Sequence, residues 1–502
     1  MAKPSPAEPK AKAKTGIPGL DNILCGGFPH NRLYLIEGAP GSGKTTLALQ
    51  FLLEGVRAGE PGLYITLSET IDELRTVARS HGFDIDGISI FQRSDEAAAE
   101  DDEQTLFHTS EVELGEAMKT LLKEVERVKP VRVVFDSLSE IHLLAQTPLR
   151  YRKQILSLKR FFAGRRCTVL LLDDETPEQG DQQLQTLAHG VILLEQLSPA
   201  YGAERRRLRI SKLRGLKYRG GYHDFKIETG GLAVFPRLVA SEHREDFEMT
   251  PAASGLAELD ALLAGGPDWG TTTLIMGPAG GGKSAIATQY ALAAIGRGQR
   301  AAMFLFDEGV GTLYARSRAL GMDVATPVAA GTLSVQQIDP AEMSPGEFAH
   351  RVRNAVERDG VRIVVIDSLN GYMSAMPEEK FLTAQLHELF TYLRQRGVLT
   401  IVIVAQHGFV GPNMDAPVDV SYLADTVLLL RNYEHGGRLH KAISTVKKRS
   451  GPHENTIRGF FMEKSGLRVG PPLESFHGIL SGLPERTDPG SGMGTAHGPP
   501  RV

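Results

Sequence analysis

The chain of 502 residues is too long for one ordinary hydrophobic core, which predicts two or three domains. Its hydrophobic fraction of 41%, charged fraction of 23% and formal net charge of −4 are typical of a soluble globular protein with no general attraction to nucleic acid or anionic membranes. The two cysteines, Cys25 and Cys167, exclude a disulfide framework and an all-cysteine zinc site. No secretory signal is visible and no run approaches the roughly 18 apolar residues of a membrane span, so we expect a cytoplasmic protein without membrane contacts.

Residues 1–14 are polar and rich in lysine and proline, and we expect them to form a disordered tail. The first domain is expected over residues 15–236. It opens with the lead-in GIPGLDNILCGG (16–27) and the apolar strand RLYLIE (32–37). A glycine-rich loop follows directly, and an amphipathic helix follows the loop.

This loop, GAPGSGKT, matches the phosphate-binding pattern G-x-x-x-x-G-K-[ST] in the required position between a strand and a helix. Glycines let successive backbone N–H groups turn towards phosphate oxygens, and the helix N-terminus adds partial positive charge. Lys44 is expected to reach the β- and γ-phosphates of ATP, and the Thr45 hydroxyl to bind Mg²⁺. The predicted nucleotide-binding residues of the loop are Gly38, Gly41, Ser42, Gly43, Lys44, Thr45 and Thr46.

Two acidic residues end later apolar strands of this domain. Asp136 closes VRVVFD (131–136) and is the predicted second ligand of Mg²⁺. Glu69 follows GLYITL (62–67), at the sheet edge where ligands of parallel sheets bind, and is predicted to polarise the attacking water. The alternative is a capping role, because LSETIDEL also resembles the start of a helix. The acidic run at 95–104 is interpreted as a solvated loop.

A basic segment, RRRLRISKLRG (205–215), lies near the end of the first domain. On a strand, Lys212 and Arg214 share one face and Leu213 lies between them. Paired cations of this kind suit a triphosphate bound by a neighbouring subunit, where an arginine contributes about 10³–10⁵ in rate. A basic surface hairpin and a nucleic-acid patch are the alternatives.

After a polar linker expected over residues 237–250, a second domain (251–484) repeats these landmarks at nearly constant spacing. The repeats are GLAELDALLAGG (255–266), GPAGGGKS (277–284), AAMFLF (301–306), VRIVVIDSL (361–369) and HKAISTVKKRSG (440–451), which indicates a tandem duplication. The corresponding predicted residues are Gly277, Gly280, Gly281, Gly282, Lys283, Ser284 and Ala285 for the nucleotide, Ser284 and Asp367 for Mg²⁺, Asp307 and Glu308 for catalysis, and Lys447, Lys448 and Arg449 for the neighbouring nucleotide. Residues 485–502 are Gly/Pro-rich and expected to be disordered.

In both halves, short apolar strands alternate with amphipathic helical segments. Strands without polar alternation are buried on both faces, which predicts an α/β fold with a mainly parallel sheet flanked by helices in each domain. The sequence therefore predicts two tandem P-loop NTPase domains. Their chemistry is not expected to be identical, because Asp307 of the second domain replaces Ser68 of the first.

The lead-in pattern G-x-x-x-L-D-x-x-L-x-G-G, the acids after the second strand and the sequence KLRG (212–215) resemble the KaiC family of circadian clock ATPases and autokinases. The resemblance covers about residues 15–484 and includes ADTVLLLRNYE (424–434) and SFHGILSGLPER (475–486). It implies RecA-like domains, ATP and Mg²⁺, and a double-ring homohexamer with ATP between subunits. It also implies slow hydrolysis in the first ring and serine/threonine autophosphorylation in the second, with Ser421 as the phosphoacceptor.

The chain departs from the family pattern at several of these positions. Tyr422 stands where the second phosphoacceptor is expected, Ser68 and Asp307 stand where the family has glutamate, and Leu320 stands at an aromatic adenine-stacking position. These departures weaken a two-site phosphorylation cycle more than they weaken ATP hydrolysis. The resemblance allows a KaiB-like or response-regulator partner, whereas the Gly/Pro-rich tail argues against a KaiA-type partner.

Two further functional classes are compatible with a P-loop duplication. A RecA- or DnaB-like DNA motor needs basic or aromatic loops along a channel, but HGFVGPNMDAPVDVSY (407–422) is close to uncharged and then acidic, so nucleic acid is not the expected partner. A regulatory scaffold that binds ATP and hardly turns it over is the other alternative.

Overall fold

The computed structural model describes residues 12–92, 110–174, 182–199, 201–374, 381–406, 421–480 and 485–486. The chain divides into two compact units, Met1–Arg237 and Leu238–Val502. The acidic run at 95–104, most of the loop at 407–422, and nearly all of both expected tails lie outside the described residues.

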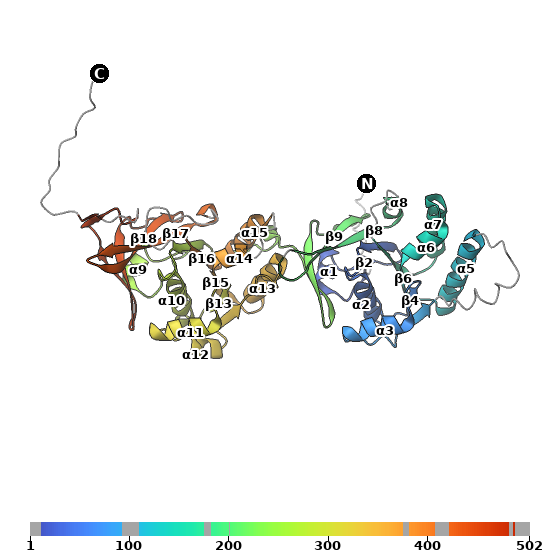
Figure 1. The fold of residues 1–502 in the computed structure, drawn as a ribbon, viewed down its shortest axis with the longest axis horizontal. Helices are drawn as coiled ribbons and strands as arrows, with labels where there is room; N and C mark the ends of the chain where they lie inside the picture. Colours follow the sequence, from blue (N-terminus) through green and yellow to red (C-terminus); the bar gives the residue numbers. More distant parts are fainter. Residues whose placement is uncertain are drawn as a thin grey trace, which may run out of the picture. The chain divides into compact units, whose positions relative to one another are not determined.

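The first unit is built on a nine-stranded sheet in the order β11-β10-β9-β8-β3-β7-β6-β4-β5. Figure 1 labels β4, β6, β8 and β9 of this sheet. Six neighbouring strands run parallel to one another, namely β8, β3, β7, β6, β4 and β5. Beyond β8, the strands β9, β10 and β11 extend the sheet with antiparallel pairing. The strands are β3 (Leu33–Gly38), β4 (Gly62–Thr66), β5 (Ser89–Gln92), β6 (Arg132–Asp136), β7 (Thr168–Asp174), β8 (Gly190–Leu197), β9 (Arg205–Leu213), β10 (His223–Glu228) and β11 (Gly231–Phe235). The helices are α1 (Pro18–Ile23), α2 (Lys44–Arg57), α3 (Ile71–Ser80), α5 (Ser110–Val128), α6 (Leu138–Ala145), α7 (Pro148–Ala163) and α8 (Gln182–Leu187).

The second unit repeats this topology, because its sheet read from the other edge is β20-β19-β18-β17-β12-β16-β15-β13-β14. The strands are β12 (Thr272–Gly277), β13 (Arg300–Leu305), β14 (Leu333–Gln337), β15 (Val361–Asp367), β16 (Leu399–Ala405), β17 (Thr426–His435), β18 (Arg438–Lys448), β19 (Ile457–Glu463) and β20 (Gly466–Pro472). The helices are α9 (Ala257–Ala261), α10 (Lys283–Gly296), α11 (Val310–Ala319), α12 (Ala325–Ala329), α13 (Pro345–Glu357), α14 (Leu369–Ser374) and α15 (Leu382–Gln395).

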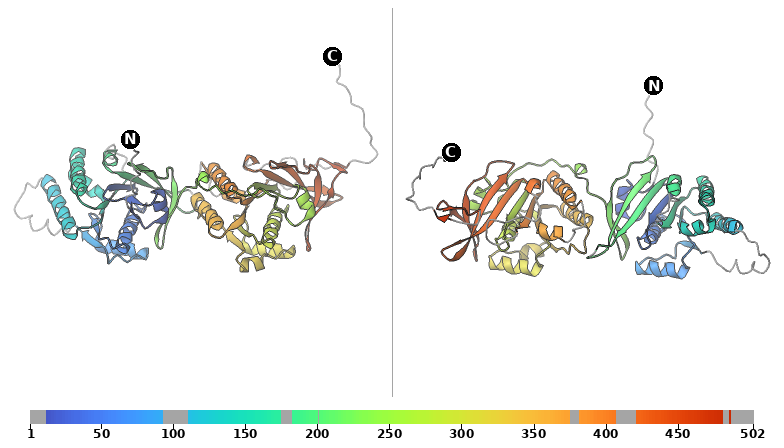
Figure 2. Two further views of the ribbon diagram at one scale, coloured as in Figure 1. Left: turned by 180° about the vertical axis from the view of Figure 1, so that it is seen from behind. Right: turned by 45° about the horizontal axis from the view of Figure 1, so that its top comes forward.

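Each sheet is buried on both faces, with a separate hydrophobic core on each side. In the first unit, Tyr34 and Ile36 of β3 pack into a core with α2 and α3, while Leu33 and Leu35 pack into a second core with α6 and α7. This alternation follows from the side chains of a strand pointing to opposite faces in turn. The views of Figure 2 show helices flanking the central strands within each unit. The predicted α/β fold, with two mainly parallel sheets flanked by helices, is confirmed.

The described residues of the predicted linker and of both predicted tails form short secondary-structure elements. Lys12–Ala13, inside the expected N-terminal tail, form β1 and pair with β2 (Phe28–Pro29). Residues 237–250, the predicted linker, contain a short 3-10 helix η1 (Ala240–Glu242) that packs on α15 of the second unit. Within the described residues, β21 (Phe476–His477) pairs with β22 (Glu485–Arg486), and no helix is long and apolar enough to cross a membrane.

Candidate active sites

Each glycine-rich loop joins the central strand of a sheet to a helix that begins at the loop lysine. Gly43 and Gly282 precede α2 and α10 with φ angles of 99° and 105°, a left-handed conformation that favours glycine. A Cβ at Gly43 would lie 2.7 Å from Ile227 Cδ1, and one at Gly282 would lie 2.5 Å from Phe460 Cε1. Backbone conformation and packing therefore both require glycine at these positions.

The two loop lysines fold back onto their own loops. Lys44 Nζ donates to the carbonyl oxygens of Gly38 (2.6 Å) and Ala39 (3.1 Å). Lys283 Nζ donates to those of Gly277 (2.9 Å) and Pro278 (2.7 Å). Burial lowers the pKa of Lys283 to about 8.

The surroundings of the two lysines differ in charge. Asp174 Oδ1 lies 2.9 Å from Lys44 Nζ and forms an ion pair with it. In the first unit, Asp174 of β7 lies opposite Gly38, the first glycine of the loop. In the second unit, Ala405 of β16 lies opposite the corresponding Gly277. The second unit therefore has alanine where the first has aspartate. The preceding pair differs in the same way, with Glu37 and Asp173 in the first unit and Met276 and Val404 in the second.

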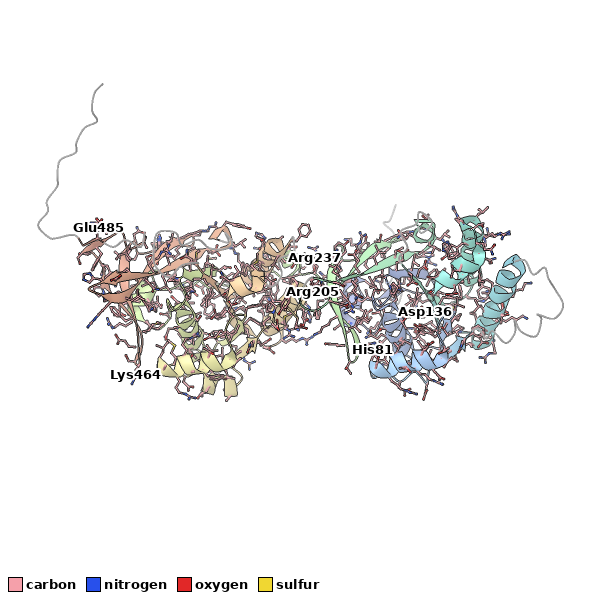
Figure 3. The ribbon with its side chains drawn as sticks, viewed as in Figure 1. His81, Asp136, Arg205, Arg237, Lys464 and Glu485 are labelled. Atoms are coloured by element: carbon pink, nitrogen blue, oxygen red, sulfur yellow. The ribbon has the colours of Figure 1, made fainter. Side chains whose placement is uncertain are left out.

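The predicted magnesium ligands lie together in the first unit. Thr45 Oγ1 donates to Asp136 Oδ2 at 3.0 Å, and the Tyr64 hydroxyl donates to the same oxygen. Burial raises the pKa of Asp136, and the hydrogen bonds from Tyr64 and Thr45 partly offset this effect. Figure 3 labels Asp136, which lies at the end of β6.

The second unit has the same pair, Ser284 and Asp367. Burial raises the pKa of Asp367, and a hydrogen bond from Ser284 lowers it. Asp367 Oδ2 is buried and has no hydrogen-bond partner among the described residues. A hydroxyl and a carboxylate are oxygen donors that fit Mg²⁺, which typically takes one or two carboxylates together with substrate phosphates. Among the described residues, no three or more His, Cys, Asp or Glu side chains lie together in a group that could hold a metal ion.

Glu69 lies in a turn after β4, where its backbone N–H donates to Thr66 Oγ1 at 3.1 Å. Its Oε2 is buried without a hydrogen-bond partner in the described structure. Burial, followed by the charges of Asp136 and Glu73, raises the pKa of Glu69. Thr70 is the N-cap of α3 and forms a capping box with Glu73, so Glu69 does not cap this helix.

In the second unit, both acids of the corresponding turn have partners. Asp307 accepts a hydrogen bond from the Ser368 hydroxyl, next to Asp367. Glu308 is bound by Arg316 of α11, whose Nη1 lies 2.7 Å from Oε1 and 2.5 Å from Oε2. Arg316 and Asp174 were not among the predicted site residues, although both are charged at positions where the other repeat is apolar.

The predicted cations of the first unit contact their own chain. Lys212 and Arg214 both donate to the carbonyl oxygen of Thr186 in α8, at 3.1 and 2.6 Å, which places them on one side of the sheet. Burial, followed by the charges of Arg214 and Lys159, lowers the pKa of Lys212. Leu213 is buried in the hydrophobic core and does not join them.

In the second unit, the side chains of Lys448 and Arg449 lie in different surroundings. The Lys448 side chain is 3% exposed, and Nζ donates to the carbonyl oxygens of Leu263 (2.6 Å) and Gly266 (3.1 Å). These contacts anchor the segment after α9. Arg449 is half-exposed and donates to the carbonyl oxygen of Tyr422 at 3.3 Å, whereas Lys447 is partly buried.

Ser421 begins the 3-10 helix η2 (Ser421–Leu423), and its side chain lies outside what is described. A pocket of about 120 Å³ lies beside this helix, lined by His387, Phe390, Thr391, Arg394, Tyr422, Leu423 and Arg449. Arg394 Nη2 is bound to both oxygens of Asp425, at 2.8 and 2.9 Å. At the predicted adenine position, Leu320 follows α11. Its counterpart in the first unit is His81, which Figure 3 labels. His81 Nε2 lies 3.3 Å from Thr46 Oγ1.

The sequence of each unit matches a model of a known protein family. The model of the KaiC ATPase family matches residues 13–239 and again residues 252–474. The chain belongs to the KaiC family. The resemblance found in the sequence motifs is therefore confirmed over both units.

Several KaiC proteins are similar to the chain over nearly its whole length. It is 26% identical to the "Circadian clock protein KaiC3" of Synechocystis sp., over 95% of this chain and 95% of that protein. It is 24% identical to the "Circadian clock oscillator protein KaiC" of Synechococcus elongatus, over 95% of this chain and 92% of that protein. The KaiC of Thermosynechococcus vestitus is 25% identical, over 96% and 93% respectively. As a member of the KaiC family, the chain is an ATP-binding ATPase.

Proposed function

We propose that both units bind ATP with Mg²⁺ and hydrolyse it, with residues of the two loops in corresponding roles. Lys44 and Lys283 would bind the β- and γ-phosphates, and the pairs Thr45–Asp136 and Ser284–Asp367 would hold Mg²⁺. The metal, when bound, neutralises charge that develops on the phosphates. The observation that carries this proposal is the hydroxyl–carboxylate pair behind each P-loop lysine, seen in both units.

Hydrolysis also needs a group that accepts a proton from the attacking water. Glu69 fits this role in the first unit, because it lies near Asp136 and has one buried oxygen without a partner among the described residues. Asp307 and Glu308 are the corresponding groups of the second unit.

Nucleotide retention and phosphate release by four proteins test these roles: the wild type, Lys44→Ala, Lys283→Ala and Glu69→Gln. We expect each lysine variant to lose one of two bound nucleotides per chain. Glu69→Gln should retain both nucleotides while the release of phosphate falls. Retention of both nucleotides by the Lys44→Ala/Lys283→Ala double variant would overturn the proposal.

We further propose that the second unit phosphorylates Ser421, as a serine/threonine autokinase. The family resemblance supports Ser421, since it stands four residues before Asp425 in the segment aligned with the acceptor pair, and three of the similar proteins are named as circadian clock proteins. Intact-mass measurement after incubation with Mg²⁺ and ATP, followed by fragmentation, should find one phosphate on Ser421. Ser421→Ala is the control, and an unchanged mass of the wild type would refute the kinase activity.

We propose that the chain acts in signalling or timing as a ring-shaped assembly. By resemblance to the family, this ring would be a homohexamer with nucleotides bound between subunits. Arg449 supports this assembly, because its side chain is half-exposed and a cation at the surface suits a nucleotide bound by a neighbouring subunit. Native mass spectrometry with and without Mg²⁺ and ATP should find nucleotide-dependent oligomers that Arg449→Ala weakens. A KaiB-like protein or a response regulator is the partner class that this function would require. A protein that stays monomeric with nucleotide bound would exclude the ring.

A further inference from the structure

The turn after the second strand holds a glutamate in both units, but among the described residues an arginine contacts this glutamate in the second unit alone. Arg316 Nη1 bridges both oxygens of Glu308, at 2.7 and 2.5 Å. The side chains of Arg316 and Glu308 are only 26% and 17% exposed. Because this pair is largely shielded from solvent, salt screens it less than it screens a surface pair.

The first unit offers a matched comparison. Helices α3 and α11 have the same length, and each begins two residues after its glutamate. The position of Arg316 in α11 corresponds to that of Val77 in α3, which has no charge to offer. Glu69 accordingly retains a buried oxygen without a hydrogen-bond partner in the described part of the chain.

This difference bears on water activation. In hydrolysis, a water oxygen bonds to the γ-phosphorus, the bond from that phosphorus to the β,γ-bridging oxygen breaks, and ADP leaves with the electron pair. The proton lost by the water passes to the carboxylate. A carboxylate that is neutralised by a guanidinium, with both oxygens engaged, accepts this proton poorly.

We propose that Arg316 is a positioning residue that holds Glu308 in an ion pair, withdraws it from water activation, and thereby slows ATP hydrolysis in the second unit. This inference rests on the proposed function of the second P-loop. Asp307, which remains outside the ion pair, then carries the residual hydrolysis. The two units would thus turn over ATP at different rates although their loops are alike.

Arg316 has a second neighbour that the test must control. Burial is the main cause of the raised pKa of Asp367, with Arg316 lowering this pKa and Glu308 raising it. Removing Arg316 alone leaves more negative charge beside a predicted magnesium ligand. Rates are therefore measured at saturating Mg²⁺, with kcat and KM for ATP determined separately.

The test uses the full chain with Glu69→Gln, so that phosphate release reports on the second unit. Adding Arg316→Val should raise kcat about tenfold, a fraction of the roughly 10²–10⁴-fold that a general base contributes, while KM changes less. Arg316→Lys keeps the charge and should retain most of the slow rate. The rise should vanish when Glu308→Gln is added to Arg316→Val, an outcome that a merely structural role of Arg316 would not produce.

A variant of the first unit, with arginine at the position that corresponds to Arg316, tests the inference independently. In a Lys283→Ala chain, whose second unit should hold no nucleotide, Val77→Arg should slow hydrolysis by the first unit, because the new guanidinium would reach Glu69. An unchanged or lower kcat in Glu69→Gln/Arg316→Val, in a protein whose Tm and nucleotide content match the parent, would overturn the inference. Undiminished nucleotide binding after Lys283→Ala would instead overturn the proposed function of the second P-loop, whatever the Arg316 variants do.

Discussion

Lys44 and Asp174 form an ion pair of 2.9 Å in the first P-loop, whereas no described residue forms an equivalent ion pair with Lys283 of the second P-loop, where Ala405 occupies the position of Asp174. A nucleotide triphosphate brings several negative charges to this lysine. Binding in the first unit must therefore overcome both the existing ion pair and the repulsion from Asp174.

Replacing Asp174 should strengthen nucleotide binding by the first unit. Asp174→Ala frees Lys44 and removes the repulsion, and because Asp174 is 37% exposed, solvent screening limits the expected gain to about three- to tenfold in Kd. Titration with a fluorescent ATP analogue in a Lys283→Ala chain measures it. Ala405→Asp, in a Lys44→Ala chain, is the matched control and should weaken binding to the second unit. A weaker Kd for Asp174→Ala would show that the aspartate assists binding instead.

The pH dependence of the first unit should reflect Glu69. Its pKa is raised, mainly by burial and further by Asp136 and Glu73, so it becomes protonated at a higher pH than an exposed glutamate does. A protonated carboxyl cannot accept a proton, and hydrolysis should fall as the pH drops through this raised pKa. Glu73→Gln removes one repulsive charge but keeps a side chain suited to the capping box, and should move the acid limb to lower pH. Phosphate release from pH 4 to 8 in a Lys283→Ala chain measures both profiles, and coincident limbs would contradict the role of Glu73.

Gly371 leaves room for Asp307. A Cβ at this position would lie 2.2 Å from Asp307 Oδ1, so Gly371→Ala must displace the carboxylate. Alanine is favoured over glycine within a helix by about 1 kcal/mol, so no loss of helix stability is expected from propensity. We expect phosphate release by the second unit to fall about tenfold or more, as for the loss of a general base. Gly311→Ala, in open space on α11, should leave the rate unchanged. Full activity of Gly371→Ala would exclude Asp307 as a reacting group.

Arg132 should contribute strongly to the stability of the first unit. Its side chain is 3% exposed, Nε lies 2.6 Å from Glu60 Oε2, and Nη1 donates to the carbonyl oxygens of Lys14 and Phe51, both at 2.7 Å. Arg132→Met should lower the free energy of unfolding by about 3 kcal/mol, because three buried or half-buried acceptors lose their donor. Hydrogen exchange of peptides from the first unit measures this loss. Arg127→Ala removes an ion pair whose arginine is exposed, and it should leave the exchange of these peptides nearly unchanged.

The sequence predicted the parts of this protein that depend on local pattern. The P-loops and the buried strands are recognisable because glycine spacing and apolar runs determine them directly. The contact of Arg316 with Glu308 forms because helix α11 turns this side chain back towards the residues that precede the helix. The contact of Asp174 with Lys44 depends on the register of β7 against β3. The sequence predicts one role for Lys447, Lys448 and Arg449, whereas the Lys448 side chain is buried and donates to backbone carbonyls of the lead-in segment. Residue type alone does not distinguish a buried lysine from an exposed one.

The divergence of the two central strands also affects how faithfully the chain folds. Two sheets of the same topology in one polypeptide allow a strand of one unit to enter the other sheet during synthesis. Such an exchange would put Glu37, which is 5% exposed and accepts a hydrogen bond from Gln185 at 2.8 Å, beside the apolar Val404. An isolated carboxylate in that position is strongly unfavourable, so the charge difference between the repeats discourages strand exchange between them.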